Sequence, residues 1–470
     1  MSTFSRKTQD LSRRGFLRFT GASAAVAGLS TTAFSAGAGA AGLAPRAADL
    51  PSGNDDAYWR EVERLFMLDR DVLYMNLGTV GSPPREVVET VDRVHREVAI
   101  GAKSAYSDFA DVRAVAAEGY GCDPDEMVIS HNTSDGMSKI LAGLNLRAGG
   151  EILTTNHEHP GGDVPMALAR DRHGVVIKRV ELPVGNDQRA EDYAVAFERA
   201  ITNRTKVMLF SAPTYKTGTM LPIPLLAKVA QAHGVTTVVD GAHIPGMMAY
   251  RFRELGVDFL AGSAAKWQCG PGGTGVLYIR NKVLPQYNPN PLPEFWPVVS
   301  SSYPGEGGLP PRSSGPEESY DIAKYLQSVG NGSLAIMAGV RTACEVWDRI
   351  GRQRIEDHAL ELSARLKELI AERWGVPSLY SPKDDPRLAS ALTAFNPFRD
   401  PADVFDEAKS DQFVARMKDE YGIVIRNVDF PVVGSAKNPV PVRISTHLFH
   451  QHDDVERVVN AMWDLAGKMS

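Results

Sequence analysis

The chain has 470 residues and a mass of 51.0 kDa, and 43% of its residues are hydrophobic while 23% are charged. This composition is typical of a globular protein and excludes a chain that is disordered throughout. The formal net charge of -6 and the pI near 6.0 leave no basic surplus, so nucleic acid is not an expected partner and small molecules are favoured.

The first 45 residues are set apart from the fold. Arg13 and Arg14 are followed by Phe16 and Leu17 and then by an Ala/Gly-rich run over residues 21–41. This pattern resembles a twin-arginine (Tat) export signal, and the alternative is a basic tail of low complexity. The run is too rich in glycine for a stable membrane span, and no later stretch has the 18 or so apolar residues that a span requires. We therefore expect a Tat translocase as a transient partner and a soluble periplasmic or secreted protein.

Strands and helices are predicted to alternate along most of the chain. A short amphipathic helix is expected over residues 58–67 and a strand over 72–76. Apolar, β-rich runs follow at residues 127–130, 151–154, 175–177, 207–210, 235–239, 259–261 and 275–279. Helical patterns lie between them at residues 135–144, 190–200 and 225–233. Such alternation predicts an α/β domain around a largely parallel sheet, in which ligands bind at the carboxyl ends of the strands.

A proline-rich segment over residues 285–311 interrupts this alternation. It is either a surface linker or a loop at an active site or dimer contact. Helices are then expected over residues 334–350 and 353–372, strands near 391–395, 422–426 and 440–445, and a terminal helix from Asp453. The predicted organisation is a signal at 1–45, an N-terminal segment at 46–75 that packs with the small domain, a large domain at 76–330 and a small α+β domain at 331–470.

The most informative residues follow two of the predicted strands. Asp240 ends the run at 235–239, and Lys266 follows the next run, just before a glycine-rich turn at 270–275. A carboxylate at the end of a buried strand can keep a pyridine nitrogen protonated, which lets pyridoxal 5'-phosphate (PLP) act as an electron sink. A lysine can bind PLP covalently and later move a substrate proton. Alone, Lys266 would be read as a solvated surface lysine, but its spacing from Asp240 and His243 favours the cofactor role.

Together these motifs resemble the class V aminotransferase family of fold type I PLP enzymes, and within it the isopenicillin N epimerase-like branch. The resemblance runs from Leu65-Phe66 and Asn76-Leu77-Gly78, through Asp240 to His243 and Lys266-Trp267, to the segment 443–445. It implies a large domain with a mostly parallel seven-stranded sheet and a smaller C-terminal α+β domain. It also implies a homodimer.

The resemblance implies roles for residues around the cofactor. Thr133 and Ser134 match the loop that binds the PLP phosphate at a helix N-terminus, where N–H groups and the helix dipole favour an anion. Ser263 matches a second phosphate-binding hydroxyl. His159 matches the histidine that stacks on the cofactor ring, with His157 as the competing assignment. His243 is expected near the cofactor's phenolic oxygen.

Other matched residues face the substrate or the second subunit. Arg443 matches the residue that binds the substrate α-carboxylate, a role suited to a planar two-point donor. Arg426 and Asn76 are further candidate substrate contacts. Asn331 stands where many relatives have a threonine that reaches the phosphate across the dimer.

Departures from the family pattern favour some reactions over others. Tyr215 stands where desulfurases carry an asparagine, and Ala265 replaces the histidine usual before the lysine. No cysteine lies between Arg426 and Arg443, although desulfurases need a nucleophilic thiol there. Cys122, Cys269 and Cys344 are widely spaced, which indicates neither a metal site nor a disulfide framework. We therefore expect an enzyme that is not a cysteine desulfurase.

The leading hypothesis is an exported PLP enzyme of aminotransferase or epimerase type, acting at Cα of an amino acid or a peptide-like metabolite. A PLP-dependent C–S or β-elimination lyase is the alternative, since all three reactions begin with deprotonation at Cα. A non-catalytic binding protein that retains the fold is an alternative of another class.

Overall fold

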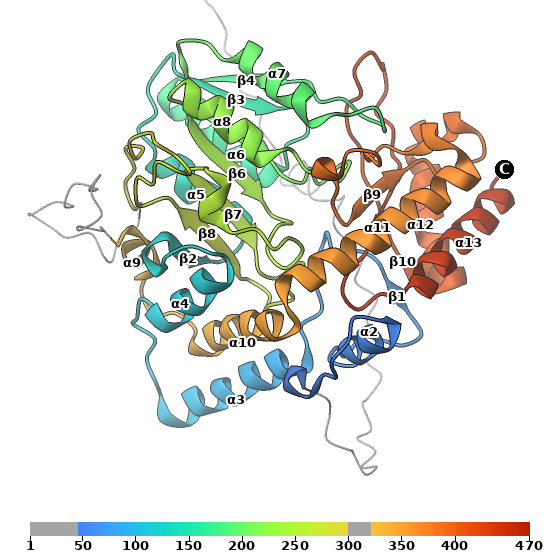
Figure 1. Ribbon diagram of the computed structural model, residues 1–470, viewed down its shortest axis with the longest axis horizontal. Coiled ribbons are helices and arrows are strands. Elements are labelled where there is room, and N and C mark those ends of the chain that lie inside the picture. The colour runs from blue at the N-terminus through green and yellow to red at the C-terminus, as the bar shows by residue number, and fades with distance from the viewer. Residues whose placement is uncertain (1–45, 299–320) are drawn as a thin grey trace, which may run out of the picture. The chain divides into compact units, whose positions relative to one another are not determined.

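A computed structural model describes residues 46–298 and 321–470 of the chain (Figure 1). The predicted export signal at 1–45 and the part of the proline-rich segment from residue 299 onward lie outside the described residues. Residues 285–298 contain no helix, and their last residues line a cavity together with Asn331.

The central feature is a seven-stranded sheet. Its order is β2 (Met127–Ser130), β8 (Gly275–Ile279), β7 (Phe259–Ser263), β6 (Thr236–Gly241), β5 (Thr205–Ser211), β3 (Glu151–Thr155) and β4 (Val176–Val180). Only β8 runs antiparallel to its neighbours, and the remaining pairs are parallel. The predicted α/β class with a mostly parallel sheet is confirmed.

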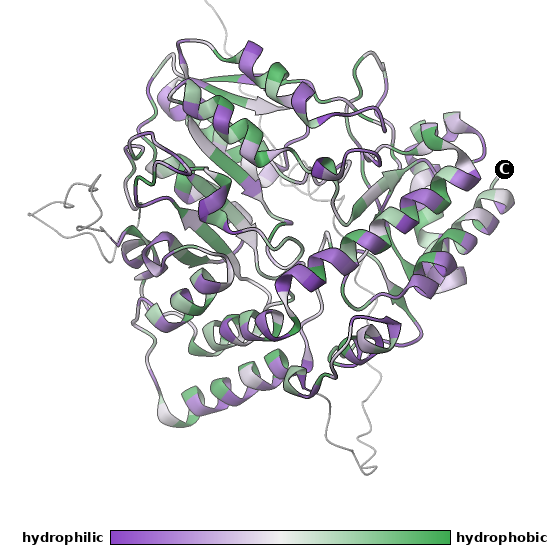
Figure 2. Cartoon of the chain, in the orientation of Figure 1, coloured by the Kyte–Doolittle hydropathy of each residue, from purple (hydrophilic) through white to green (hydrophobic). Residues whose placement is uncertain are grey.

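The sheet is apolar on both faces because helices cover both. Successive residues of one strand enter different cores: Val238 packs with one cluster of buried residues and Val239 with another. This is the pattern expected of a buried parallel strand, whose side chains alternate between faces. Figure 2 shows the strands as largely hydrophobic, whereas the helices carry hydrophilic residues as well. The connecting helices are α5 (Thr133–Gly143), α6 (Pro160–His173), α7 (Ala190–Ala200) and α8 (Ile223–Ala232).

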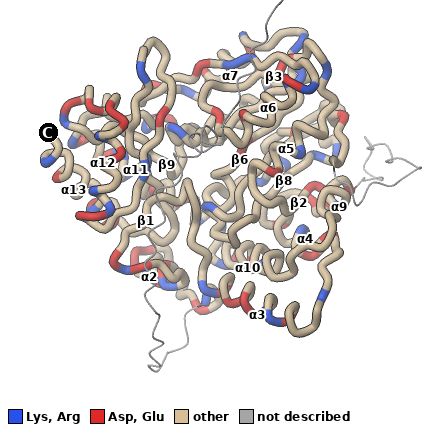
Figure 3. The backbone as a smooth tube through the Cα atoms, turned by 180° about the vertical axis from the view of Figure 1, so that it is seen from behind, with Lys and Arg blue, Asp and Glu red and all other residues tan. Residues whose placement is uncertain are grey.

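A second group of helices packs beside the sheet. Helix α10 (Leu334–Ile350) contacts both α3 (Arg85–Gly101) and α4 (Ala110–Gly119), and α9 (Ile322–Gln327) packs on β2. Helix α2 (Asp56–Glu63) precedes them in the chain. Figure 3 shows basic and acidic residues interspersed along α3, as on a solvated helix face. Among the described residues, no helix combines the length and apolar character needed to span a membrane.

The C-terminal part has its own small sheets and core. It contains α11 (Arg352–Trp374), β9 (Leu392–Phe395), α12 (Glu407–Tyr421), β10 (Ile423–Val424), β11 (Arg426–Asn427), β12 (Val442–Ser445) and α13 (His452–Lys468). Strands β11, β12 and β9 form an antiparallel sheet. Strand β10 instead pairs in parallel with β1 (Leu73–Tyr74), so the predicted strand at 422–426 is divided between two sheets. The division into domains at residue 330 stays a prediction.

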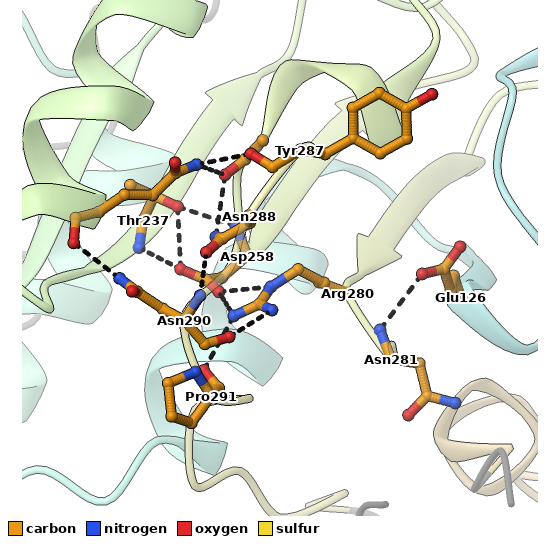
Figure 4. A network of polar contacts seen from close by, with 11 residues as sticks. Glu126, Thr237, Asp258, Arg280, Asn281, Tyr287, Asn288, Asn290 and Pro291 are labelled. Atoms are coloured by element: carbon orange, nitrogen blue, oxygen red, sulfur yellow. Dashed lines mark hydrogen bonds and ion pairs between the residues drawn. The ribbon is translucent and has the colours of Figure 1, made fainter. Parts of the chain in front are cut away.

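One end of the large sheet is fixed by a buried ion pair (Figure 4). Arg280 follows β8 and donates to Asp258 Oδ1 from Nε at 2.8 Å and from Nη2 at 2.6 Å. Asp258 Oδ2 accepts hydrogen bonds from the backbone N–H and the hydroxyl of Thr237 on β6. Arg280 also donates to the backbone oxygens of Asn290 and Pro291. This network joins three strands at the end opposite Asp240, and leaves the carboxyl ends of β6 and β7 for ligand binding.

Candidate active site

A cavity of about 250 Å³ lies at the carboxyl ends of the central strands. The predicted site residues that line it are Thr133, Ser134, His159, Asp240, Ser263, Lys266 and Arg426. They come from β6, β7, β11, the loop after β7 and the N-terminal ends of α5 and α6. Segments far apart in the sequence therefore meet here, as expected for an open α/β sheet.

The N-terminus of α5 borders the cavity with unpaired polar groups. Asn132 caps the helix, since its side chain accepts a hydrogen bond from the backbone N–H of Asp135 at 2.9 Å. Thr133 Oγ1 is buried and has no hydrogen-bond partner. Free N–H groups and a hydroxyl at a helix N-terminus are suited to a phosphate. Ser263, the last residue of β7, lines the same cavity.

Asp240 is buried near the end of β6, with 2% of its surface exposed. Its Oδ1 accepts a hydrogen bond from the backbone N–H of Ala242 at 3.1 Å, and its Oδ2 has no partner. Burial raises the pKa of this carboxyl, while the nearby positive charge of Lys266 lowers it. A buried carboxyl oxygen without a partner is costly unless a ligand donates to it.

Lys266 lies in a loop between β7 and β8, three residues beyond Ser263. The pKa of Lys266 is lowered from 10.5 to about 8, mainly by burial and in part by the positive charges of Arg443 and Arg426, against the opposing effect of Asp240. The amine therefore loses its proton more readily than that of an ordinary lysine, which favours a nucleophilic role. The next residue, Trp267, donates from Nε1 to His243 Nδ1 at 3.0 Å, and His243 Nε2 is left without a partner.

The two candidate stacking histidines lie in different surroundings. His159 caps α6 and lines the cavity, and its Nδ1 accepts a hydrogen bond from the backbone N–H of Gly161 at 3.0 Å. Burial and the neighbouring cations lower the pKa of His159 to about 4, so its ring is neutral. His157 is fully buried, and its Nε2 lies 3.1 Å from the carbonyl oxygen of Pro431. Of the two, His159 is the one that faces the cavity.

Arg443 lies on β12 against the wall of the cavity. Its Nη1 donates to the backbone oxygen of Tyr215 at 2.7 Å, whereas its Nε and Nη2 are buried without partners. The guanidinium occupies the space beside Gly78, where an added Cβ would stand 2.5 Å from Nη2. Asn76 lies nearby but does not line the cavity, and its Oδ1 accepts a hydrogen bond from Thr79 Oγ1.

Asn331 is the predicted residue that lies apart from this group. It lines another cavity, together with Asp135 and Lys139, and its Oδ1 accepts a hydrogen bond from the backbone N–H of Ala105 at 2.6 Å. A contact between Asn331 and phosphate across a dimer stays a prediction.

Glu158 and Tyr215 were not assigned site roles from the sequence. Glu158 is buried and accepts hydrogen bonds from Ser211 Oγ at 2.6 Å and Thr155 Oγ1 at 2.5 Å. Burial raises its pKa to about 7, and the neighbouring charge of Asp240 contributes. The Tyr215 ring meets His159 edge to face, with ring centroids 4.9 Å apart. Glu158 directly precedes His159, and this position could have indicated a place in the site. Its burial beside Asp240 cannot be predicted from the sequence.

Comparison with known proteins agrees with this architecture. The family model described as "Aminotransferase class-V" matches residues 86–458, and the chain belongs to this family. The chain is 28% identical over 426 residues to "Isopenicillin N epimerase" of Streptomyces clavuligerus, which covers 88% of this chain and 99% of that protein. It is 26% identical over 424 residues to a "Probable cysteine desulfurase" of Pyrococcus abyssi, which covers 86% of this chain and 97% of that protein.

A solved structure with the same fold is a mutant of C-DES with glycine covalently linked to its PLP cofactor. Its TM-score is 0.66 at 22% identity, and the match covers 84% of this chain and 97% of that chain.

PLP is the cofactor of this enzyme family, and the residues present fit it. Buried polar atoms without partners occur on two residues that line the cavity, Thr133 Oγ1 and Asp240 Oδ2. Further ones occur on two residues behind its lining: His243 Nε2, next to Ala242, and the free edge of Arg443, against Gly78. They offer groups of the kinds needed for a phosphate, a protonated ring nitrogen, a phenolic oxygen and a carboxylate. Native proteins leave few buried polar atoms unsatisfied, so this concentration indicates a polar ligand.

The exclusion of cysteine desulfurases is wrong. Relatives named as probable cysteine desulfurases match 86% and 87% of this chain at 26% and 25% identity. The exclusion rested on Tyr215, on Ala265 and on the absence of a cysteine from residues 427–442. The absence of a thiol from that segment leaves intact the shared machinery for deprotonation at Cα, from which C–S cleavage also begins.

Proposed function

We propose that this protein is a PLP-dependent enzyme of aminotransferase or epimerase type, acting at Cα of an amino acid or a peptide-like metabolite. The observation that carries the proposal is the group formed by Lys266 and Asp240, which line one cavity, and Arg443, which packs against Gly78 in the wall of that cavity. The match to isopenicillin N epimerase over nearly that protein's whole length supports an epimerase type. The desulfurase relatives support a PLP-dependent C–S or β-elimination lyase as the second candidate.

Each residue has a distinct part in the proposed reaction. When bound, PLP supplies an electron sink that stabilises negative charge at Cα. Lys266 binds the cofactor and, once free, moves the Cα proton, and its lowered pKa of about 8 supports this role. Asp240 holds a proton on the ring nitrogen. Arg443 orients the α-carboxylate, so that the Cα–H bond is presented to the amine.

His159 and the α5 N-terminus are proposed to hold the cofactor. The flat face of His159 would restrict the ring, and its neutral state avoids adding a further positive charge beside Lys266. Thr133, Ser134 and Ser263 supply hydroxyls for the phosphate.

Replacing Lys266 with alanine tests the central assignment. Lys266→Ala should fold and retain PLP only noncovalently, because the attachment amine is gone. Borohydride treatment followed by mass analysis should then find no cofactor fixed to the chain. A borohydride-fixed adduct in this variant would refute the assignment.

The reaction type is tested with the wild-type enzyme, PLP and amino acids in D₂O. We expect deuterium at Cα, accompanied by keto-acid formation with an added acceptor or by the opposite enantiomer. Sulfide with pyruvate and ammonia from cysteine, or alanine with sulfide released only when a thiol reductant is added, would instead identify C–S chemistry. If no amino acid exchanges its Cα hydrogen and no product forms, the non-catalytic alternative is favoured.

We further propose that residues 1–45 direct Tat-dependent export, that the mature enzyme acts in the periplasm or outside the cell, and that it is a homodimer. Arg13-Arg14 followed by an Ala/Gly-rich run supports export. Because the Tat pathway carries folded proteins, PLP can be bound before export. Replacement of both arginines with lysine should retain the protein in the cytoplasm. Export of that variant with its N-terminus removed would refute the proposal.

A further inference from the structure

A surplus of positive charge surrounds His159. Lys266, Arg426, Arg443 and Lys216 all act electrostatically on this histidine. Within residues 46–298 and 321–470, none of the four forms an ion pair with a carboxylate: Arg443 and Lys216 donate to backbone oxygens, and Arg426 to a backbone oxygen and a hydroxyl. Buried or half-buried cations are usually paired, because removing a charge from water is costly. The missing anions are therefore expected on ligands.

Arg443 alone can satisfy one carboxylate. Its Nη1 is already used by the backbone oxygen of Tyr215, while Nε and Nη2 are both buried and free. Two free donors on one guanidinium match the two oxygens of a carboxylate. The α-carboxylate of an amino acid thus needs no second arginine.

Arg426 lies directly opposite Arg443 in the antiparallel pair of β11 and β12. Side chains at such positions lie on the same face of the sheet, about 4.5–5.5 Å apart at Cβ, and like charges there are unfavourable. Arg426 lines the cavity. Its Nε donates to the backbone oxygen of Asn427 at 3.0 Å and its Nη1 to Thr79 Oγ1 at 3.4 Å. The two arginines lie side by side although their like charges repel. An anion bound at each arginine would reduce this repulsion.

On the basis of the proposed function, we propose that Arg426 binds a second carboxylate, carried by the side chain or peptide-like extension of the substrate. The substrate is then a dicarboxylic amino acid or a metabolite with two carboxylates. Arg443 holds the α-carboxylate and Arg426 the distal one. Lys216 adds to the positive field that favours a dianion over a monoanion.

Unreactive dicarboxylates test the proposal without turnover. Titration calorimetry on the PLP-loaded enzyme measures the dissociation constants of succinate, glutarate and adipate. Each is compared with the monocarboxylate of equal carbon number: butyrate, valerate or hexanoate. The best dicarboxylate should bind at least about 10-fold more tightly than its monocarboxylate, the factor that corresponds to roughly 1.4 kcal/mol for one charge-assisted contact.

Variants at Arg426 test whether this residue causes the preference for dicarboxylates over monocarboxylates. In Arg426→Gln the dicarboxylate advantage should fall to within about twofold, while monocarboxylate binding stays near wild type. Arg426→Lys should keep part of the advantage because it keeps the charge, and it provides the test if the glutamine variant does not fold. Arg199→Gln, on the exposed face of α7, is the matched control and should behave as wild type.

Two results would overturn the proposal. One is equal affinity of wild type for dicarboxylates and monocarboxylates. The other is an equal loss of both in Arg426→Gln, which would mean that the two arginines hold a single carboxylate. Cα–H exchange in D₂O separates this inference from the proposed function: a dicarboxylate preference that depends on Arg426 supports the anion site even where no amino acid exchanges its hydrogen.

Discussion

The unpaired positive charge of Lys266 should reduce the stability of the PLP-free protein. The pKa of Lys266 is lowered from 10.5 to about 8, mainly by burial. At about 1.4 kcal/mol for each pKa unit, this corresponds to about 3 kcal/mol of destabilisation when the amine is charged. Replacement by methionine, which keeps the length of the side chain and removes the charge, should therefore stabilise the PLP-free protein.

The pH dependence of this effect follows from proton linkage. Below about pH 8 the folded and unfolded states both hold the proton on Lys266, so the full destabilisation is present. Between about pH 8 and 10.5 the unfolded state binds more protons than the folded state, so wild-type stability rises with pH. Above that range the amine is neutral in both states, and the difference from Lys266→Met disappears.

Urea unfolding of both proteins from pH 6 to pH 11, after removal of PLP, measures this difference. Lys266→Met should be more stable by about 3 kcal/mol at the acidic end, with the gap closing through the range stated above. Lys206→Met, at an exposed lysine on β5, is the control and should show no such gap. A pH-independent difference, or a Lys266→Met protein less stable than wild type at pH 7, would refute the reasoning.

Three further substitutions test other parts of the structure. Asp240→Ala should lower kcat by about 100-fold or more, since the ring nitrogen loses its ion partner, and wild-type rates would count against that role. Arg443→Lys should lower kcat/KM by about 10-fold or more, because the amine keeps the charge but loses the two-point contact, while the absorbance of bound PLP stays unchanged. If PLP binding is lost instead, Arg443 is structural. Asp258→Ala should cost about 3–5 kcal/mol of unfolding free energy in urea titrations, because Arg280 and Thr237 lose their hydrogen bonds to the buried carboxylate. Asp258→Ala combined with Arg280→Met should recover part of this loss.

The bounds of strands and helices could be predicted from the sequence where the local residue pattern alone determines the element. The strand runs at 127–130 and 275–279 and the helices at 190–200 and 334–350 were placed with the bounds that the structure has. Helices α3, α4, α6, α9 and α12 were not predicted. Helix α6 contains Pro165 within its span, and a proline inside a segment indicates a break in a helix. The strand expected at 422–426 is divided because Ile423 pairs with Leu73, a partner no local pattern identifies.

For the site, the reactive residues could be predicted from the sequence, but their contacts with distant segments could not. Asp240 and Lys266 could be selected from sequence because their residue types and spacing carry the chemistry. The choice between His157 and His159 depends on which ring faces the cavity, and that depends on the contact of His157 with Pro431, distant in sequence. The pairing of Arg426 with Arg443 likewise follows from strand register, which the sequence did not specify.

The close approach of Arg443 to Gly78 affects how variation in this chain should be interpreted. A Cβ at position 78 would lie 2.5 Å from Nη2 and 2.9 Å from Cζ of Arg443, so even alanine must displace the guanidinium. In a saturation mutagenesis screen scored by growth or activity, substitutions at Gly78 should cluster with those at Arg443, although glycine has no side chain to contact a substrate. The substitutions tolerated at position 78 therefore depend on the space that the side chain of Arg443 needs, 365 positions later in the chain.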